Sequence, residues 1–108
     1  MFRSVLHLSP GPLGAGAIVD FYERNDILLK ALRDGGCLQA EVQVRVPHSD
    51  DVVVTALWLS AAEYERWIGS PARRTDAKDL EGMLAPDVLP LGAGDLYEVV
   101  ATTERADR

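Results

Sequence analysis

The sequence has almost no cysteine, since Cys37 is the only one in 108 residues. A single cysteine cannot form an internal disulfide, and it cannot supply the cysteine sets that structural zinc sites use. The disulfide-rich class of small secreted domains is therefore excluded, and we assign no metal site. The lone thiol also favours a reducing, cytoplasmic setting.

Long apolar runs and basic residues are also scarce. No stretch approaches the roughly 18 apolar residues of a membrane-spanning helix, and Met1-Phe2-Arg3-Ser4 lacks the apolar core of an export signal. Eleven Lys and Arg residues stand against 17 Asp and Glu residues, which gives a net charge of −6. A chain of this charge is a poor partner for nucleic acid or for an anionic membrane surface, so we expect neither partner.

The composition that remains is that of an ordinary globular protein, with 47% hydrophobic and 26% charged residues. The length predicts one domain that is large enough to bury a core of its own. We place this domain at residues 1–103 and a polar C-terminal tail at residues 104–108.

The first part of the chain predicts a strand and then a helix. Residues 2–8 are apolar and rich in strand formers, and Ser9-Pro10-Gly11-Pro12 ends that strand. From Ala15 the apolar residues recur at helical spacing, and Gly35-Gly36 marks the end of one helix. The apolar positions of this helix are Ile18, Phe21, Tyr22, Leu28, Leu29 and Leu32.

Two neighbouring strands are predicted next. Residues 38–46 alternate between apolar and polar side chains, which is typical of a strand with one buried face. Residues 47–51 form a turn, and residues 52–59 are apolar at nearly every position, as in a strand covered on both faces. The second strand is therefore expected to lie deeper in the fold than the first.

The remaining segments complete the pattern. Ser60-Ala61-Ala62-Glu63 has the spacing of a capping box and predicts a helix from Ala61, and Ser70-Pro71 predicts a second helix start. Ala77, Leu80 and Leu84 are its candidate buried stripe, and residues 96–102 form the last strand.

This order of strands and helices is that of the ferredoxin-like split βαβ fold, an α+β class. We expect a four-stranded antiparallel sheet with helices on one face. The other face must also be covered, and a two-fold homodimer would cover it.

Both tryptophans of the chain lie in the segment from Ala56 to Pro71, nine residues apart. Aromatic side chains that meet between helices and a sheet could line an apolar pocket for a flat, small aromatic ligand, or they could simply fill the core. The residues that could converge there are Phe21, Tyr22, Trp58, Tyr64 and Trp67.

The run from Trp58 to Trp67, followed by Ser70-Pro71, resembles the antibiotic biosynthesis monooxygenase family of the dimeric α+β barrel superfamily. Tyr97-Glu98-Val99-Val100 resembles the last strand of that family. Known members include cofactor-free oxygenases that convert anthrone-like polyketide intermediates to quinones, and heme-degrading monooxygenases. The resemblance implies a dimeric barrel and a small-molecule pocket.

The resemblance also implies roles for single residues. In the polyketide oxygenases the residues that match Trp58 and Tyr64 line the substrate pocket, while Val54 stands where they have an asparagine. In the heme degraders the residue that matches Trp67 belongs to the site. Their iron-ligating histidine has no counterpart in residues 73–78, and since heme iron needs an axial ligand, heme degradation is disfavoured. No cofactor is therefore expected.

Other polar residues are candidates for chemistry. His7 has the unperturbed pKa range of a general base, or it is a histidine satisfied within the sheet. Tyr22 is a second candidate for proton transfer. Arg73 and Arg74 could hold an anionic oxygen at the pocket mouth, or they could form a solvated helix face.

Two function classes stay open. The first is a cofactor-independent monooxygenase, or a related enzyme, for an aromatic polyketide-like substrate of secondary metabolism. The second is a non-catalytic small-molecule-binding or pathway accessory protein with the same fold. A polar group that reaches into an open pocket would favour the enzyme, and a pocket filled by its own side chains would favour the accessory role.

Overall fold

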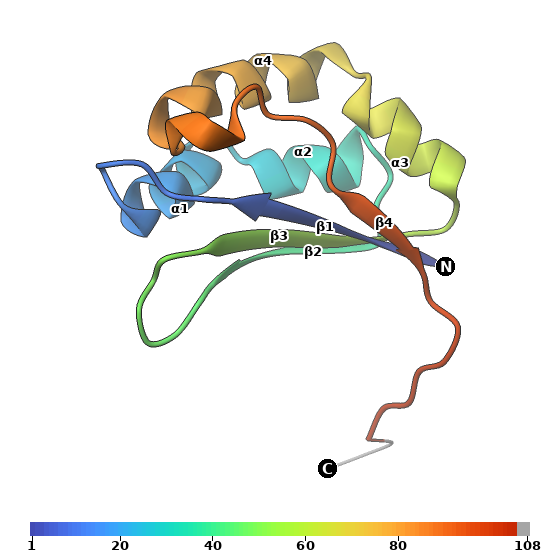
Figure 1. Ribbon diagram of the computed structural model, residues 1–108. Coiled ribbons are helices and arrows are strands. Elements are labelled where there is room, and N and C mark those ends of the chain that lie inside the picture. The colour runs from blue at the N-terminus through green and yellow to red at the C-terminus, as the bar shows by residue number, and fades with distance from the viewer. Residues whose placement is uncertain (106–108) are drawn as a thin grey trace.

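The computed structural model describes residues 1–105 and contains one antiparallel sheet with the strand order β2-β3-β1-β4. All helices lie on one face of this sheet, and the other face is left uncovered (Figure 1). The predicted ferredoxin-like α+β class is therefore confirmed. The elements are β1 (Phe2–Leu8), α1 (Ala15–Arg24), α2 (Ile27–Arg33), β2 (Gln39–Val44), β3 (Val52–Trp58), α3 (Ala61–Ile68), α4 (Pro71–Leu80), the short 3-10 helices η1 (Glu81–Met83) and η2 (Pro86–Val88), and β4 (Asp95–Glu98).

The single helix predicted after Ala15 is wrong, because the structure has two helices there. α1 ends at Arg24, and Asp26 then adopts a left-handed backbone conformation with φ of 50°. Asp and Asn tolerate this conformation better than other non-glycine residues. The Asn25 side chain also donates a hydrogen bond to the Phe21 carbonyl at 2.9 Å, which caps α1. The break lets the end of α1 and the start of α2 both pack against the sheet.

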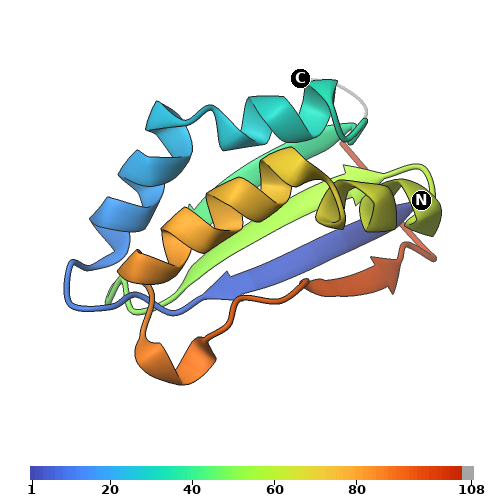
Figure 2. The same ribbon diagram turned by 90° about the horizontal axis from the view of Figure 1, so that it is seen from above.

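The two predicted helix starts after β3 are confirmed. Ser60 Oγ accepts a hydrogen bond from the Glu63 amide at 3.2 Å, and Ser70 Oγ accepts one from the Arg73 amide at 3.2 Å. These caps satisfy amides that have no partner inside the helix. α3 and α4 follow one another with almost no linker, and α4 lies above the central strands (Figure 2).

The strand register separates the two faces of the sheet. Ser4, Leu6 and Leu8 on β1 pair with Ala56, Val54 and Val52 on β3, and these six side chains point toward the helices. His7 pairs with Val53 and therefore lies on the opposite, open face. The open face of β2 carries Gln39, Glu41 and Gln43, as the alternation predicted. In the described chain only one face of β3 is covered by helices.

The last strand is shorter than predicted. Pairing of β4 with β1 runs from Asp95 opposite Val5 to Glu98 opposite Phe2. A bond from the Val99 amide to the Met1 carbonyl, at 2.8 Å, follows, and residues 99–105 have no regular structure. The apolar pattern of residues 96–102 therefore extends beyond the ladder with β1. The predicted tail over 104–108 lies partly outside the described residues.

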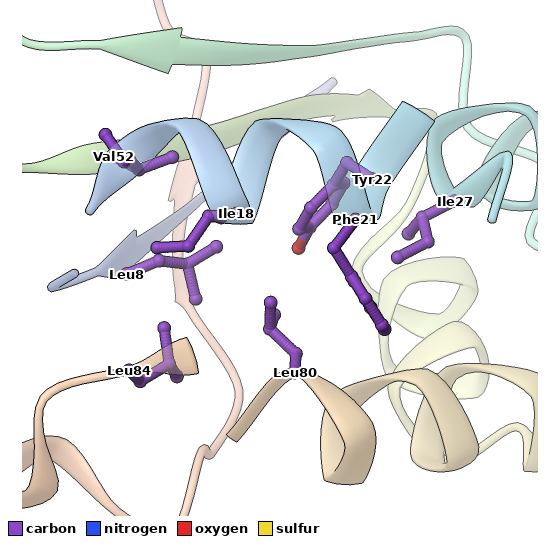
Figure 3. Close-up of a cluster of buried hydrophobic side chains, with 9 residues drawn as sticks. Leu8, Ile18, Phe21, Tyr22, Ile27, Val52, Leu80 and Leu84 are labelled. Carbon is purple, nitrogen blue, oxygen red and sulfur yellow. The ribbon is translucent and has the colours of Figure 1, made fainter. Parts of the chain in front are cut away.

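The core consists of two clusters of buried side chains. The first is aliphatic with two aromatic members, and Figure 3 shows it between α1, α4 and the strands. The second surrounds the tryptophans at the other end of β3. Among residues 1–105, no helix has the length and apolar character needed to cross a membrane. The first cluster contains Leu8, Ala15, Ile18, Phe21, Tyr22, Ile27, Val52, Leu80 and Leu84, and the second contains Ala31, Cys37, Ala56, Trp58, Tyr64 and Trp67.

Candidate active site

A cavity of about 70 Å³ lies under the helices, where the two core clusters meet. Its wall is mainly apolar, and it is partly open to solvent. An apolar cavity with a few polar groups is the usual form of a small-molecule site. The lining residues that carry the argument are Val54, Trp58, Tyr64, Trp67, Tyr22, Arg73 and Asp76.

Trp58 forms the inner wall of the cavity at the end of β3, and the whole residue is only 1% exposed. Its indole Nε1 donates a hydrogen bond to Ser4 Oγ at 3.0 Å, so the ring nitrogen already has a buried partner. The Tyr64 ring meets it edge-on, with a centroid distance of 5.4 Å and an interplanar angle of 64°. Both contacts hold the indole in one orientation, which gives the cavity a rigid flat wall.

Tyr64 of α3 is fixed by the loop that precedes β4. Its hydroxyl accepts a hydrogen bond from the Gly94 amide at 2.9 Å and donates one to the Gly94 carbonyl at 3.4 Å. A Cβ at Gly94 would lie 2.5 Å from the Val5 carbonyl oxygen, so this approach of loop to sheet requires glycine. Burial raises the pKa of the Tyr64 hydroxyl. The Tyr64 hydroxyl therefore acts as both donor and acceptor toward Gly94, and it joins α3 to the loop before β4.

Trp67 of α3 closes the cavity on the side of α2. Its ring packs against Gly35, where a Cβ would come within 3.0 Å of the indole and within 2.7 Å of the Ala31 carbonyl oxygen. The glycine that ends α2 therefore makes room for this aromatic wall. Trp58, Tyr64 and Trp67 line one cavity.

Tyr22 of α1 differs from Tyr64, the other tyrosine of the cavity, because its hydroxyl has no hydrogen-bond partner among residues 1–105. The residue is 7% exposed and lines the cavity. Burial raises the pKa of this hydroxyl to about 12; the Arg73 charge acts against this rise and the Asp76 charge adds to it. The phenol therefore stays protonated at neutral pH, where it can donate a hydrogen bond into the cavity.

The polar side of the cavity comes from α4. Arg73 lines it, and its guanidinium donates to the Gly92 carbonyl at 2.9 Å. Asp76 is 8% exposed and accepts a hydrogen bond from Lys30 Nζ of α2 at 2.9 Å. Sequence reasoning missed Asp76. The signal was available, because Asp76 precedes Ala77 and stands four residues before Leu80, on the buried stripe of the same helix.

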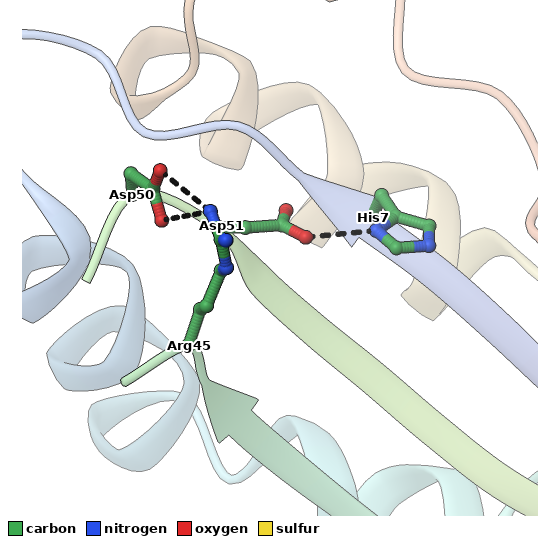
Figure 4. Close-up of polar contacts among 4 residues, drawn as sticks. All are labelled: His7, Arg45, Asp50 and Asp51. Atoms are coloured by element: carbon green, nitrogen blue, oxygen red, sulfur yellow. Dashed lines mark hydrogen bonds and ion pairs between the residues drawn. The ribbon is translucent and has the colours of Figure 1, made fainter. Parts of the chain in front are cut away.

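Several predicted site residues lie elsewhere. The His7 side chain is 60% exposed on the open face, and its Nδ1 lies 3.1 Å from Asp51 Oδ2 (Figure 4). Phe21 is buried in the first cluster and does not line the cavity. Arg74 donates to the Gly69 carbonyl at 2.6 Å and ties the end of α3 to α4. The structure thus brings Val54, Tyr22 and Arg73 to the cavity with the aromatic wall. His7, Phe21 and Arg74 lie away from it.

Other reactive groups do not contribute to the cavity. Burial raises the pKa of the Cys37 thiol, which disfavours the reactive thiolate. Within the part of the chain that the structure describes, no three His, Cys, Asp or Glu side chains gather as a metal site. The cavity therefore offers an apolar wall beside a phenol, a carboxylate and a guanidinium, which could contact the polar edge of a flat aromatic molecule.

Comparison with known proteins identifies the fold. No protein-family model matches the chain, and no curated protein matches it in sequence. A proposed antibiotic biosynthesis monooxygenase from Deinococcus radiodurans superposes with a TM-score of 0.76 at 16% identity, over 99% of this chain and 100% of that chain. A similar protein from Nitrosomonas europaea gives 0.74 at 12% identity, over 94% and 100%.

A third solved structure adds a described activity. It is SnoaB from Streptomyces nogalater, a cofactor-independent oxygenase, crystallised as an asparagine-to-alanine variant. Its TM-score is 0.74 at 12% identity, over 96% of this chain and 97% of that chain. These structures share the fold of this chain along nearly its whole length. The resemblance to antibiotic biosynthesis monooxygenases is thereby confirmed at the level of the fold.

Proposed function

We propose that this protein is a cofactor-independent monooxygenase that oxidises an aromatic, polyketide-like small molecule. The observation that carries the proposal is the unpartnered Tyr22 hydroxyl in an apolar cavity walled by Trp58, Tyr64 and Trp67. The shared fold of the cofactor-independent oxygenase SnoaB supports the same reaction class. A substrate with an acidic C–H or O–H group supplies the electrons, so the protein needs only to bind, orient and shield it.

The chemistry balances without a cofactor. An anthrone-like substrate loses a proton to give an electron-rich enolate, which reacts with dioxygen. One oxygen atom enters the substrate as a carbonyl, and the other leaves as water with the two hydrogens of the reacting carbon. The Tyr22 hydroxyl donates a hydrogen bond to the enolate oxygen, and the Arg73 charge favours the same anion. The aromatic walls keep the anion from bulk water.

Val54 defines how this chain departs from the polyketide oxygenases. It stands on the helix-facing side of β3 and lines the cavity, where those enzymes place an asparagine. A valine donates no hydrogen bond, so the polar contacts to the substrate come from α1 and α4 instead of β3. We propose that Tyr22 takes over the role of hydrogen-bond donor to the substrate.

The proposal includes a homodimer formed through the open face of the sheet. Val5, Val53 and Leu57 lie on that face, where no helix covers them. Two copies placed face to face would remove this apolar surface from water. Light scattering at micromolar concentration should give a mass of two chains, and a monomer mass would contradict this part of the proposal.

A non-catalytic binding protein is the second candidate. The small cavity favours it, because about 70 Å³ is less than the roughly 150 Å³ of an engineered cavity that admits benzene. Only one ring edge of a larger molecule fits without side-chain movement. A protein of this kind would bind an aromatic ligand and leave it unchanged.

Oxygen uptake in the presence of anthrone separates the two candidates. The enzyme should consume one dioxygen for each anthraquinone formed, faster than the buffer alone. Tyr22→Phe should lower kcat by about 100-fold, the typical loss for one oxyanion donor. Quenching of tryptophan fluorescence by anthrone without oxygen uptake would instead establish the binding role. Under both candidate functions, adding hemin to the protein should give no Soret shift.

A further inference from the structure

Asp76 is a carboxylate in an otherwise apolar cavity, and Lys30 satisfies only one of its two oxygens. Lys30 Nζ lies 2.9 Å from Oδ2. No group among residues 1–105 donates a hydrogen bond to Oδ1. Lys30 itself is not part of the cavity lining, whereas Asp76 is. Every fully buried polar side-chain atom of the described residues has a hydrogen-bond partner, so the unpartnered Oδ1 is not sealed off and stays accessible to a donor from a ligand.

Tyr22 is the complementary group in the same cavity. Its hydroxyl is a free donor, Asp76 Oδ1 is a free acceptor, and the two residues make no hydrogen bond to each other within the described chain. Arg73, one turn before Asp76 on α4, already donates to the Gly92 carbonyl. Among the polar groups of the cavity lining, the Tyr22 hydroxyl is therefore a donor and Asp76 Oδ1 an acceptor that the described chain leaves without a partner.

We infer that Tyr22 and Asp76 form an oxygen-binding subsite for an aromatic ring that carries both a hydroxyl group and a carbonyl oxygen. Asp76 accepts the hydrogen bond of the ligand hydroxyl, Tyr22 donates to the carbonyl, and Lys30 positions the carboxylate. The inference rests on the proposed function only for the aromatic nature of the ligand, since it concerns binding and not oxygenation.

A purely structural role for Asp76 is the competing explanation. The Lys30–Asp76 ion pair joins α2 to α4, and such a bond alone would require no ligand. The two roles differ in what they recognise. A structural bond affects all ligands equally, whereas an acceptor for a hydroxyl group discriminates between ligands with and without that group.

The test uses two probes that differ by one hydroxyl group, 3-hydroxyacetophenone and acetophenone. Calorimetry gives the hydroxyl preference, defined as the Kd of acetophenone divided by that of 3-hydroxyacetophenone. Wild type should show a preference of about tenfold or more, as expected for a hydrogen bond to a charged group. Asp76→Asn, which keeps the size of the side chain, should lower the preference to less than about threefold.

Tyr22→Phe is the matched variant. Both probes carry the carbonyl, so this change should weaken both by a similar factor and leave the preference intact. The Tyr22→Phe measurement keeps the inference testable even if Asp76→Asn does not fold. If the hydroxyl preference disappears in Tyr22→Phe, the ligand hydroxyl binds Tyr22 instead of Asp76, and the inference is overturned.

Other results would also overturn it. These are equal affinity of wild type for both probes, no binding of 3-hydroxyacetophenone at millimolar concentration, or an unchanged preference in Asp76→Asn. A hydroxyl preference without oxygen uptake from anthrone would contradict the proposed function and support the subsite. Oxygen uptake from anthrone by a protein that shows no hydroxyl preference would support the proposed function and contradict the subsite.

Discussion

The two faces of the sheet show how strongly one step along a strand changes the role of a residue. Leu6 and His7 are neighbours on β1, yet Leu6 lines the cavity under the helices and His7 lies on the open face. The covered face carries Trp58, and the space between this face and the helices holds the aromatic wall and the Tyr22 hydroxyl. The open face holds His7, which the sequence offered as a candidate base or as a histidine satisfied within the sheet. Strand periodicity therefore decides which polar residue can meet a ligand in this cavity.

The largest expected difference between the faces is in stability. Trp58→Ala on the covered face removes a fully buried ring and its bond to Ser4, and should lower the free energy of unfolding by about 3–5 kcal/mol. Leu57→Ala, the adjacent residue on the open face, is the matched control and should cost clearly less at concentrations where the protein is monomeric, because the proposed dimer would bury Leu57. Urea unfolding measures both. Equal losses would show that the open face is buried as deeply as the covered one.

The Tyr22 hydroxyl should make the covered face sensitive to alkali. Its folded pKa of about 12 lies above the unfolded value of 10, so the folded state holds the proton more tightly. The stabilisation is complete below pH 10 and is lost as pH rises toward 12, by about 2–3 kcal/mol. Tyr22→Phe should lose less over this range. Tyr64, whose pKa is also raised, accounts for part of the remaining loss.

About half of that alkaline loss should occur between pH 9 and pH 11, and the urea midpoints at these two pH values measure it. An identical fall in wild type and Tyr22→Phe would contradict a buried, unpartnered phenol. In an alkaline titration of the folded protein, tyrosine absorbance should show an ionisation step at the highest pH that is absent in Tyr22→Phe.

The buried hydrogen bond between Trp58 and Ser4 should contribute less. Ser4→Ala leaves the indole Nε1 without its acceptor and should cost about 1–3 kcal/mol. Trp58→Phe removes the donor, so Ser4→Ala in that background should cost much less. The four unfolding energies form a double-mutant cycle. Additive losses would show that the 3.0 Å contact carries no coupling energy.

The smallest effect is expected on the open face. His7→Ala removes an exposed contact with Asp51 and should change the free energy of unfolding by less than about 0.5 kcal/mol. It should also leave oxygen uptake with anthrone unchanged. A large fall in uptake would place the chemistry on the open face and contradict the cavity as the site.

Much of this arrangement follows from local sequence signals. The capping serines Ser60 and Ser70 fix the starts of α3 and α4, and the helical spacing of Tyr64 and Trp67 aims both rings at the strand that ends in Trp58. Alternation along β2 correctly assigns its polar row to the free face. These features depend on neighbours within a few residues, so the sequence contains them directly.

The features that the sequence did not predict depend on distant partners. The ladder of β4 ends at the pairing of Glu98 with Phe2, and the helix break at Asp26 depends on a left-handed backbone that no composition pattern predicts. Asp76 was missed because an acidic residue in a polar helix suggests solvent, whereas Lys30 from another helix allows its burial. The place of Asp76 on the buried stripe of α4 follows from helical spacing, whereas its pairing with Lys30 is visible only in the folded chain.

The most direct test of the account is a crystal structure of the protein with a hydroxylated anthraquinone bound. The account predicts that one ring lies between Trp58 and Trp67, with a ligand oxygen within hydrogen-bond distance of the Tyr22 hydroxyl. A ligand bound on the open face beside His7, with the cavity empty, would contradict it.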